Sequence, residues 1–364
     1  MTTPVRAQLH DDPADPAIAP AWDALASAAG TANPFYGRDT LIAAMHLPGA
    51  AKPRLLLLWG AGGQLDGLLP VARRPLIRGA AHATENWDQR ARALGEPLIR
   101  PGREAMVWRA ALAALDRSGG LHLRLSALDA HSASTAALRE VAAGLGRPVY
   151  ETRRYERAIL VGGGSSEEHC AQHIRGKVLK EHRRLRARLA DQAPLMFERL
   201  APDGDVDCWT SDLFALEATG WKGREGVDAG ADPATEAAYR AILARAHEAG
   251  SLDFHRMMLG DRVVAMLANL EIGDTGFQLK IAYDEAFASY SPGVLLEMEY
   301  LRYALDQRRL ALVDSCARAG HPMIDRIWPA RRTIVSLAVP FVSPLSRGFC
   351  AAADRWRRRA KAVS

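Results

Sequence analysis

The sequence predicts a mixed α/β protein (an α+β fold) built from two similar halves, each with a mostly antiparallel central sheet flanked by helices. The chain has 364 residues, which is enough for two domains with sizeable cores. Its composition, 48% hydrophobic and 24% charged, excludes a disordered, collagen-like or coiled-coil chain. Each half contains a strand, a turn and a strand between helical segments, which indicates a structural repeat.

In the first half, two apolar runs on either side of a glycine-rich turn (60–64) predict a β-hairpin with strands at 55–59 and 65–71. Alternating apolar residues predict another strand at 121–125. Helical patterns are expected at 17–29, 104–116 and 134–145.

The clearest linker signal is the run Gly162-Gly163-Gly164. It predicts an N-terminal domain (1–160), a C-terminal domain (161–330) and a basic tail (331–364). Ser165 or Ser166 can cap the helix that follows the linker. The elements expected in the second half are helices at 168–191, 206–219, 233–249 and 294–307, and strands at 252–259, 263–272, 276–283 and 310–314.

The most informative unit is the strand, loop and helix at 276–306. The turn Ser291-Pro292-Gly293 suits a helix start, because proline lacks an N–H and glycine allows a close approach of the backbone. Free N–H groups at such a helix end can bind a phosphate or another anion. A plain capped helix is the alternative interpretation.

Five segments in a fixed order carry a family resemblance. They are the basic run Arg175–Arg186, the run Leu216–Gly223, the hairpin residues Val264–Leu267, the run Tyr283–Gly293 and the pair Val313-Asp314. Together, over about residues 168–330, they resemble the CelD-type, FemAB-like branch of the GNAT acyltransferase superfamily. Similar proteins often carry a Tyr-Lys pair after the last aspartate-containing strand, whereas this chain has His321-Pro322 and the residues that follow.

The resemblance implies a tandem GNAT fold and acyl transfer from a thioester, usually acyl-CoA, to an amine. Such a reaction needs a base for the amine, N–H donors for the oxyanion and a site for the carrier's phosphates. The candidate groups for the carrier are Lys280, Ser291, Gly293, Val294 and Leu295. Lys280 could contact a phosphate, but it has a second interpretation, because a lysine on an apolar strand can also extend its ammonium to solvent at the sheet edge.

The candidate bases are Glu217, His255, Asp284, Asp314 and His321. Four of these residues also have a purely structural interpretation. Glu217 could be a solvated carboxylate on a helix, and His255 could be a structural histidine on a strand. Asp314 could cap the end of its strand, and His321 could be an ordinary histidine in a loop. We expect Glu217, His255, Asp314 and His321 to include the catalytic residues.

Other chemistries lack a sequence signal. The four cysteines lie far apart with no C-x-x-C, which argues against a disulfide scaffold or a cysteine zinc site and fits a reducing compartment. The sequence has no H-E-x-x-H, Walker loop or G-x-S-x-G motif, so we expect no metal. The N-terminal residues contain acids and prolines where a signal peptide has an apolar core, so a cytoplasmic location is expected.

The positive charge is concentrated at the C-terminal end. From Arg326 onward there are nine Lys or Arg residues and one acid, a net charge of +8, whereas the preceding residues sum to −3. The uncharged run 333–346 is shorter than the roughly 20 residues that cross a bilayer. Its basic flanks suit an anionic membrane surface, and a last helix or strand packed on the domain is the alternative.

These observations together predict an N-acyltransferase that uses acyl-CoA and the amine of a small or lipophilic acceptor. With a membrane-facing tail, the enzyme would lie on the inner face of the cell membrane, and the sequence is then similar to the bacterial ceramide synthases of sphingolipid metabolism, whose acceptor is a sphingoid base. One alternative is FemAB-like transfer from aminoacyl-tRNA, with the basic helix near 174–188 on the RNA. Otherwise we expect no nucleic acid. Another alternative is a non-catalytic GNAT-like module that binds a lipid or polymer.

Overall fold

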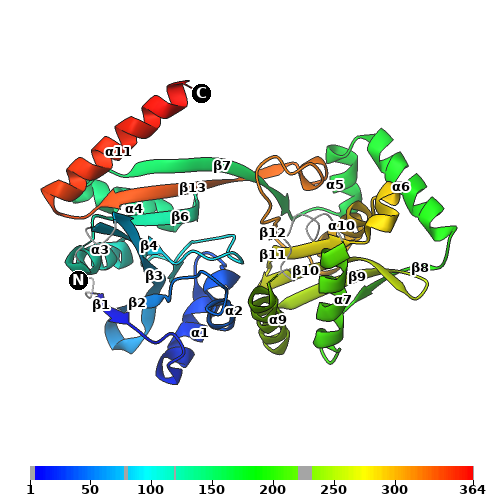
Figure 1. The fold of residues 1–364 in the computed structure, drawn as a ribbon, viewed down its shortest axis with the longest axis horizontal. Coiled ribbons are helices and arrows are strands. Elements are labelled where there is room, and N and C mark those ends of the chain that lie inside the picture. The colour runs from blue at the N-terminus through cyan, green and yellow to red at the C-terminus, as the bar shows by residue number, and fades with distance from the viewer. Residues whose placement is uncertain (1–4, 78–80, 119, 220–231, 364) are drawn as a thin grey trace. The chain divides into compact units, whose positions relative to one another are not determined.

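The structure is a computed structural model that describes residues 5–77, 81–118, 120–219 and 232–363. The chain divides into two compact units (Figure 1). Unit 1 comprises Met1–Met45, Gly49–Tyr155 and Thr333–Ser364, and unit 2 comprises His46–Pro48 and Glu156–Arg332. The change from one unit to the other therefore falls inside strand β7, Tyr150–Val161, a few residues before the glycine run that suggested a boundary.

Unit 1 holds a sheet in the order β1-β2-β3-β4-β6-β13, with β5 paired to β3. Its strands are β1 Arg6–His10, β2 Arg54–Trp59, β3 Leu65–Ile77, β4 Ala81–Asn86, β5 Leu98–Ile99, β6 His122–Asp129 and β13 Ala330–Pro340. Its helices are α1 Ala19–Ala28, α2 Arg38–Ala44, α3 Glu104–Leu115, α4 Ala133–Gly144 and α11 Pro344–Val363.

Unit 2 holds a sheet in the order β8-β9-β10-β11-β12-β7. Its further strands are β8 Leu195–Arg199, β9 Leu252–Leu259, β10 Arg262–Ile272, β11 Thr275–Tyr283 and β12 Leu312–Asp314. Its helices are α5 Ser166–His173, α6 Gly176–Ala190, α7 Val206–Thr219, α9 Pro233–Glu248 and α10 Pro292–Arg302, the last continued by a π-helical turn at Tyr303–Gln307.

The two sheets repeat one pairing pattern. In unit 1, antiparallel strands β1 to β4 are followed by the parallel pair β4–β6 and by the antiparallel strand β13. In unit 2, antiparallel strands β8 to β11 are followed by the parallel pair β11–β12 and by the antiparallel strand β7. The predicted mixed α/β fold, with mostly antiparallel sheets flanked by helices, is confirmed.

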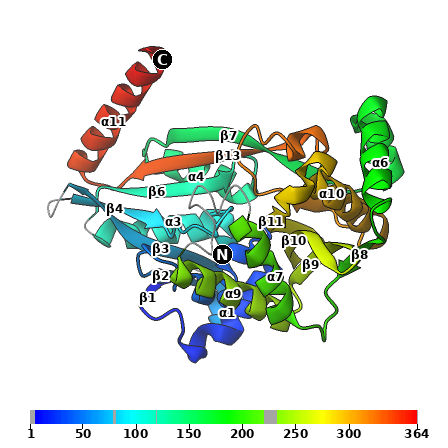
Figure 2. The same cartoon turned by 45° about the vertical axis from the view of Figure 1, so that its right-hand side comes forward.

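Helices cover both faces of the unit 2 sheet (Figures 1 and 2). On one face, α6 and α10 pack on Met257, Leu267 and their neighbours. On the other face, α7 and α9 enclose a second cluster around Phe254 and Met266. Because successive side chains of a strand point to opposite faces, β9 and β10 supply residues to both clusters.

Most local predictions match the structure closely. Ser165 caps α5 and forms a capping box with Glu168, and Gly250 follows α9 with a φ of 68°. The long helix expected at 168–191 is instead two helices, α5 and α6, because Ile174 and Arg175 have extended backbone between them.

The apolar segment of the predicted tail is buried. Val335, Leu337 and Val339 lie in β13, have no exposed surface and belong to unit 1. The basic residues that follow form α11. In the described ranges, no helix combines the length and hydropathy needed to span a bilayer.

Candidate functional site

The candidate site lies where β11 parts from its parallel neighbour. The pairing between β11 and β12 joins Thr275, Gly276 and Phe277 to Leu312, Val313 and Asp314. Strand β12 then ends, whereas β11 continues to Tyr283. Beyond Phe277 the two strands therefore no longer form a ladder.

A β-bulge follows this point. Ala268 of β10 pairs with Lys280 and Asn269 pairs with Gln278, so Leu279 is an extra residue in β11. A bulge changes which face a following side chain occupies. Consistent with this, Gln278 donates a hydrogen bond to Glu297 on α10, and Lys280 instead reaches α7 on the opposite face.

Glu217 and Lys280 form a buried ion pair on that opposite face. The Nζ atom of Lys280 lies 2.8 and 2.7 Å from the two carboxylate oxygens of Glu217. Glu217 is 2% exposed, so it is not the solvated helix carboxylate of the alternative interpretation. The ammonium also lies 4.5 Å from the ring centre of Tyr239 on α9 and 5.7 Å from that of Phe214 on α7. A carboxylate and an ammonium are thus enclosed together beside the bulge.

The turn before α10 also lies beside this end of β11. Helix α10 begins at Pro292, two residues before the predicted start at Val294, and Ser291 precedes it with a left-handed φ of 53°. Gly293 is buried, and a Cβ added there would lie 3.4 Å from Tyr283 and 3.6 Å from Met323. Val294 is half-buried. Leu295 lines a cavity of about 290 Å³ together with Arg183 and other residues of α5, α6 and α10.

His255 occupies the other face of the sheet. Its Nε2 atom is 2.7 Å from Oδ2 of Asp253, and both side chains are nearly buried. Its ring packs edge-on against Tyr300 and Tyr303, and all three residues line a cavity of about 460 Å³. His255 and Glu217 therefore do not share one site, because the sheet lies between them.

Asp314 is enclosed by arginines. Its Oδ2 accepts hydrogen bonds from Arg157 at 2.6 Å and Arg332 at 2.9 Å, and Oδ1 accepts one from the Cys316 N–H at 2.9 Å. The side chain has no exposed surface. In this geometry the carboxylate ties together β7, β12 and β13.

The two remaining candidate bases lie in loops of unit 2. Half-buried His321 accepts a bond from the Ile324 N–H through Nδ1. Asp284 caps the 3-10 helix Glu285–Tyr290 by accepting a bond from the Ala286 N–H, and it pairs with Arg262.

Glu297 on α10 is a buried carboxyl whose one hydrogen-bond donor is Gln278 among the described residues. Burial raises its pKa from 4.5 to about 8, and the bond from Gln278 opposes this only partly. Glu297 is therefore protonated in the folded protein at neutral pH.

The pKa of Glu297 is higher in the folded protein, about 8, than the ordinary value of 4.5. The free energy of unfolding should therefore fall as the pH rises between these two pKa values. We expect Glu297→Gln to remove this dependence. Between pH 6 and 8, the free energy of unfolding of the wild type should fall by roughly 2 kcal/mol relative to the variant. Urea unfolding at both pH values measures the difference, and parallel pH profiles would contradict the expectation.

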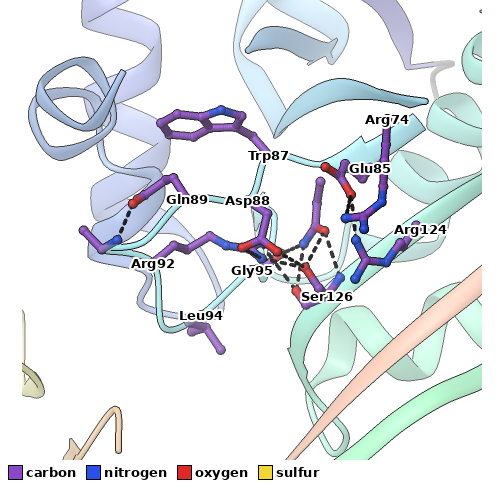
Figure 3. Close-up of polar contacts among 12 residues, drawn as sticks. Arg74, Glu85, Trp87, Asp88, Gln89, Arg92, Leu94, Gly95, Arg124 and Ser126 are labelled. Carbon is purple, nitrogen blue, oxygen red and sulfur yellow. Dashed lines mark hydrogen bonds and ion pairs between the residues drawn. The ribbon is translucent and has the colours of Figure 1, made fainter. Parts of the chain in front are cut away.

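The matching position in unit 1 is closed by the chain itself. The parallel pair β4–β6 ends at Glu85 and Arg124, and Asn86 then bonds to the Ser126 backbone through both ends of its amide, at 2.9 and 2.8 Å. Gly95 inserts beside β6, where an added Cβ would lie 2.1 Å from the Ser126 carbonyl oxygen. Figure 3 shows buried Arg92 completing the closure through bonds to Asp88 and Ser126. Unit 1 therefore has no open strand edge at this position.

The family comparison agrees with the geometry. Residues 176–319 match the model of the acetyltransferase (GNAT) domain. This part of the chain is therefore similar to the GNAT acetyltransferase family. The matched segment contains β11, its bulge, the Glu217–Lys280 pair and the turn before α10. No curated protein matches the chain by sequence.

Solved structures share the fold over nearly the whole chain. A conserved protein of unknown function from Bacteroides thetaiotaomicron is 14% identical, with a TM-score of 0.58 over 89% of this chain and 97% of that one. FemX is 10% identical, with a TM-score of 0.58 over 88% and 95%. L-PGS from Bacillus licheniformis is 13% identical, with a TM-score of 0.55 over 97% and 99%. These likenesses concern the fold.

Sequence reasoning selected Glu217 and Lys280 separately and did not pair them. It missed Asp253 beside His255, although their spacing of two on one strand is a usable signal. It also missed Tyr239 and the two arginines around Asp314, which come from distant segments. Part of the resemblance, Gly220–Gly223, lies outside the described residues. Within those residues, no group of three or more His, Cys, Asp or Glu side chains is arranged to hold a metal.

Proposed function

We propose that unit 2 is an N-acyltransferase that moves an acyl group from acyl-CoA to the amine of a small or lipophilic acceptor. The observation that carries the proposal is the bulged end of β11, where its ladder with β12 has ended, beside the buried Glu217–Lys280 pair and within the segment that matches the GNAT domain. Unit 1 has the same strand order but a closed strand edge, so the proposal assigns the chemistry to unit 2.

Each part of the site has a role in this proposal. Glu217 accepts the proton that an ammonium acceptor must lose before it attacks. Lys280 holds the carboxylate in place. Backbone N–H groups of β11 beyond Phe277 donate to the oxyanion of the tetrahedral intermediate. The C–N bond forms, the C–S bond breaks, and the second proton leaves with the CoA thiol.

The carrier's phosphates would lie at the start of α10. Ser291, Gly293 and Val294 form the turn, and Leu295 leads to the cavity of about 290 Å³. That cavity is lined by Arg183, Arg186 and Arg302 together with acidic and apolar residues, so it offers cations for phosphate.

A lipophilic amine is our preferred acceptor, and a sphingoid base is the specific candidate, which would make the product a ceramide. The test is incubation of the purified chain with a long-chain acyl-CoA and a sphingoid base, followed by mass spectrometry for the amide. A panel of small amines in parallel separates acceptor choice from activity. Absence of an amide with every amine and acyl length would refute acyl-CoA-dependent transfer.

Transfer from aminoacyl-tRNA is the second candidate, and the exposed basic face of α6 favours it. Lys177, Lys180, Arg183 and Arg184 are exposed there. A salt-sensitive complex with aminoacyl-tRNA, together with no rise in the unfolding midpoint on adding acyl-CoA, would favour this donor.

A further inference from the structure

Helix α11 carries an exposed apolar strip that the acyl-transfer proposal does not use. Leu345 and Trp356 are 72% and 71% exposed, and Val342, just before the helix, is 61% exposed. Only two other large apolar side chains among the described residues, Val161 and Met196, are comparably exposed. Leu345 and Trp356 are eleven residues apart in sequence, which is about three helical turns, so they share one side of α11.

The start of the helix is attached to unit 1 by three side chains. Ser346 and Cys350 are buried, and Phe349 stacks on His122 of β6 with ring centres 6.0 Å apart. Beyond this contact, the C-terminal half of α11 extends away from the rest of unit 1 in both views (Figures 1 and 2). Packing of Ser346, Phe349 and Cys350 therefore secures the start of the helix, whereas Leu345 and Trp356 stay exposed.

Two of the basic residues of α11 border this strip. The helix contains six basic residues and a single acid, Asp354. Asp354 is 13% exposed, bonds to Arg358 at 2.7 Å and lies close to Arg357, and the helical repeat places it opposite the strip. Arg355 and Arg359 are exposed and lie along one side of the strip.

We propose that this face of α11 docks on an anionic lipid surface, with Leu345 and Trp356 inserted at the level of the headgroups and the arginines among the phosphates. An apolar strip bordered by arginines is the pattern by which interfacial helices bind anionic bilayers. The buried β13 segment has no part in this contact. The inference goes beyond the proposed acyl transfer and holds for any acceptor.

The test is sedimentation of the full chain with vesicles of phosphatidylcholine, with and without phosphatidylglycerol. The wild type should bind the anionic vesicles and release them at high salt. Trp356→Ala, and separately the double variant Arg355→Gln and Arg359→Gln, should each weaken binding by about tenfold or more. All of these side chains are exposed, and an unchanged unfolding midpoint would show that the fold is intact.

A matched control removes the same charge elsewhere in unit 1, through Arg73→Gln and Arg109→Gln at exposed positions. It should bind vesicles as the wild type does. The proposal is overturned if the wild type does not bind, or if the control loses binding equally. It is also overturned if Trp356→Ala has no effect, because the helix would then attract polyanions in general, or if light scattering shows a dimer that depends on Trp356.

Discussion

Glu217→Gln should lower kcat for acyl transfer by about a hundredfold or more, with little change in KM for the acyl-CoA. The amide keeps the size of the carboxylate and can still accept a bond from Lys280, but it cannot take a proton from the acceptor. Steady-state rates across pH measure the effect.

A double variant distinguishes a base from a structural partner. Glu217→Gln alone leaves the buried ammonium of Lys280 without its counter-charge, which by itself can disturb the site. Adding Lys280→Met removes that charge. If Glu217 only neutralises Lys280, the double variant should regain activity; if Glu217 is the base, activity should stay low. Recovery, or a single variant within about threefold of the wild type, would remove Glu217 from the chemistry.

Asp314→Asn should lower the free energy of unfolding by about 3–5 kcal/mol, because it leaves Arg157 and Arg332 buried without their shared carboxylate. That is a large part of the 5–15 kcal/mol that typically stabilises a domain. Urea unfolding measures the loss, and the yield of folded protein is a second measurement if the variant is too unstable to titrate.

The matched control is Glu236→Gln on α9. Glu236 pairs with Arg240 at 2.7 Å, but both side chains are about one-third exposed, so the loss should be under about 1 kcal/mol. If the two substitutions lowered the free energy of unfolding equally, burial would not be what makes the ion pairs of Asp314 important for stability.

The local fold was predictable because it depends on nearby residues. The β9–β10 hairpin follows from two apolar runs around Gly260, and the start of α10 follows from Pro292. The sequence could not show that β13 pairs with the sheet of unit 1 or that β7 pairs with the sheet of unit 2. Both strands pair with segments far away in the chain, and no local pattern reports such a partner.

The site was predictable in part for the same reason. Lys280 lies on a strand in which residues two apart normally share a face, and only the pairing with β10 reveals the bulge at Leu279. Because of the bulge, Lys280 lies on the same face of the sheet as Glu217, opposite the face of Gln278. Likewise, nothing near Asp314 in the sequence indicates Arg157.

Hydrogen–deuterium exchange with and without a long-chain acyl-CoA tests most directly whether unit 2 binds acyl-CoA. We expect slower exchange in 278–296, which covers the bulge of β11 and the start of α10, and unchanged exchange around Asn86 and Gly95 in unit 1. Unchanged exchange in 278–296 at saturating acyl-CoA, or protection confined to unit 1, would contradict this expectation.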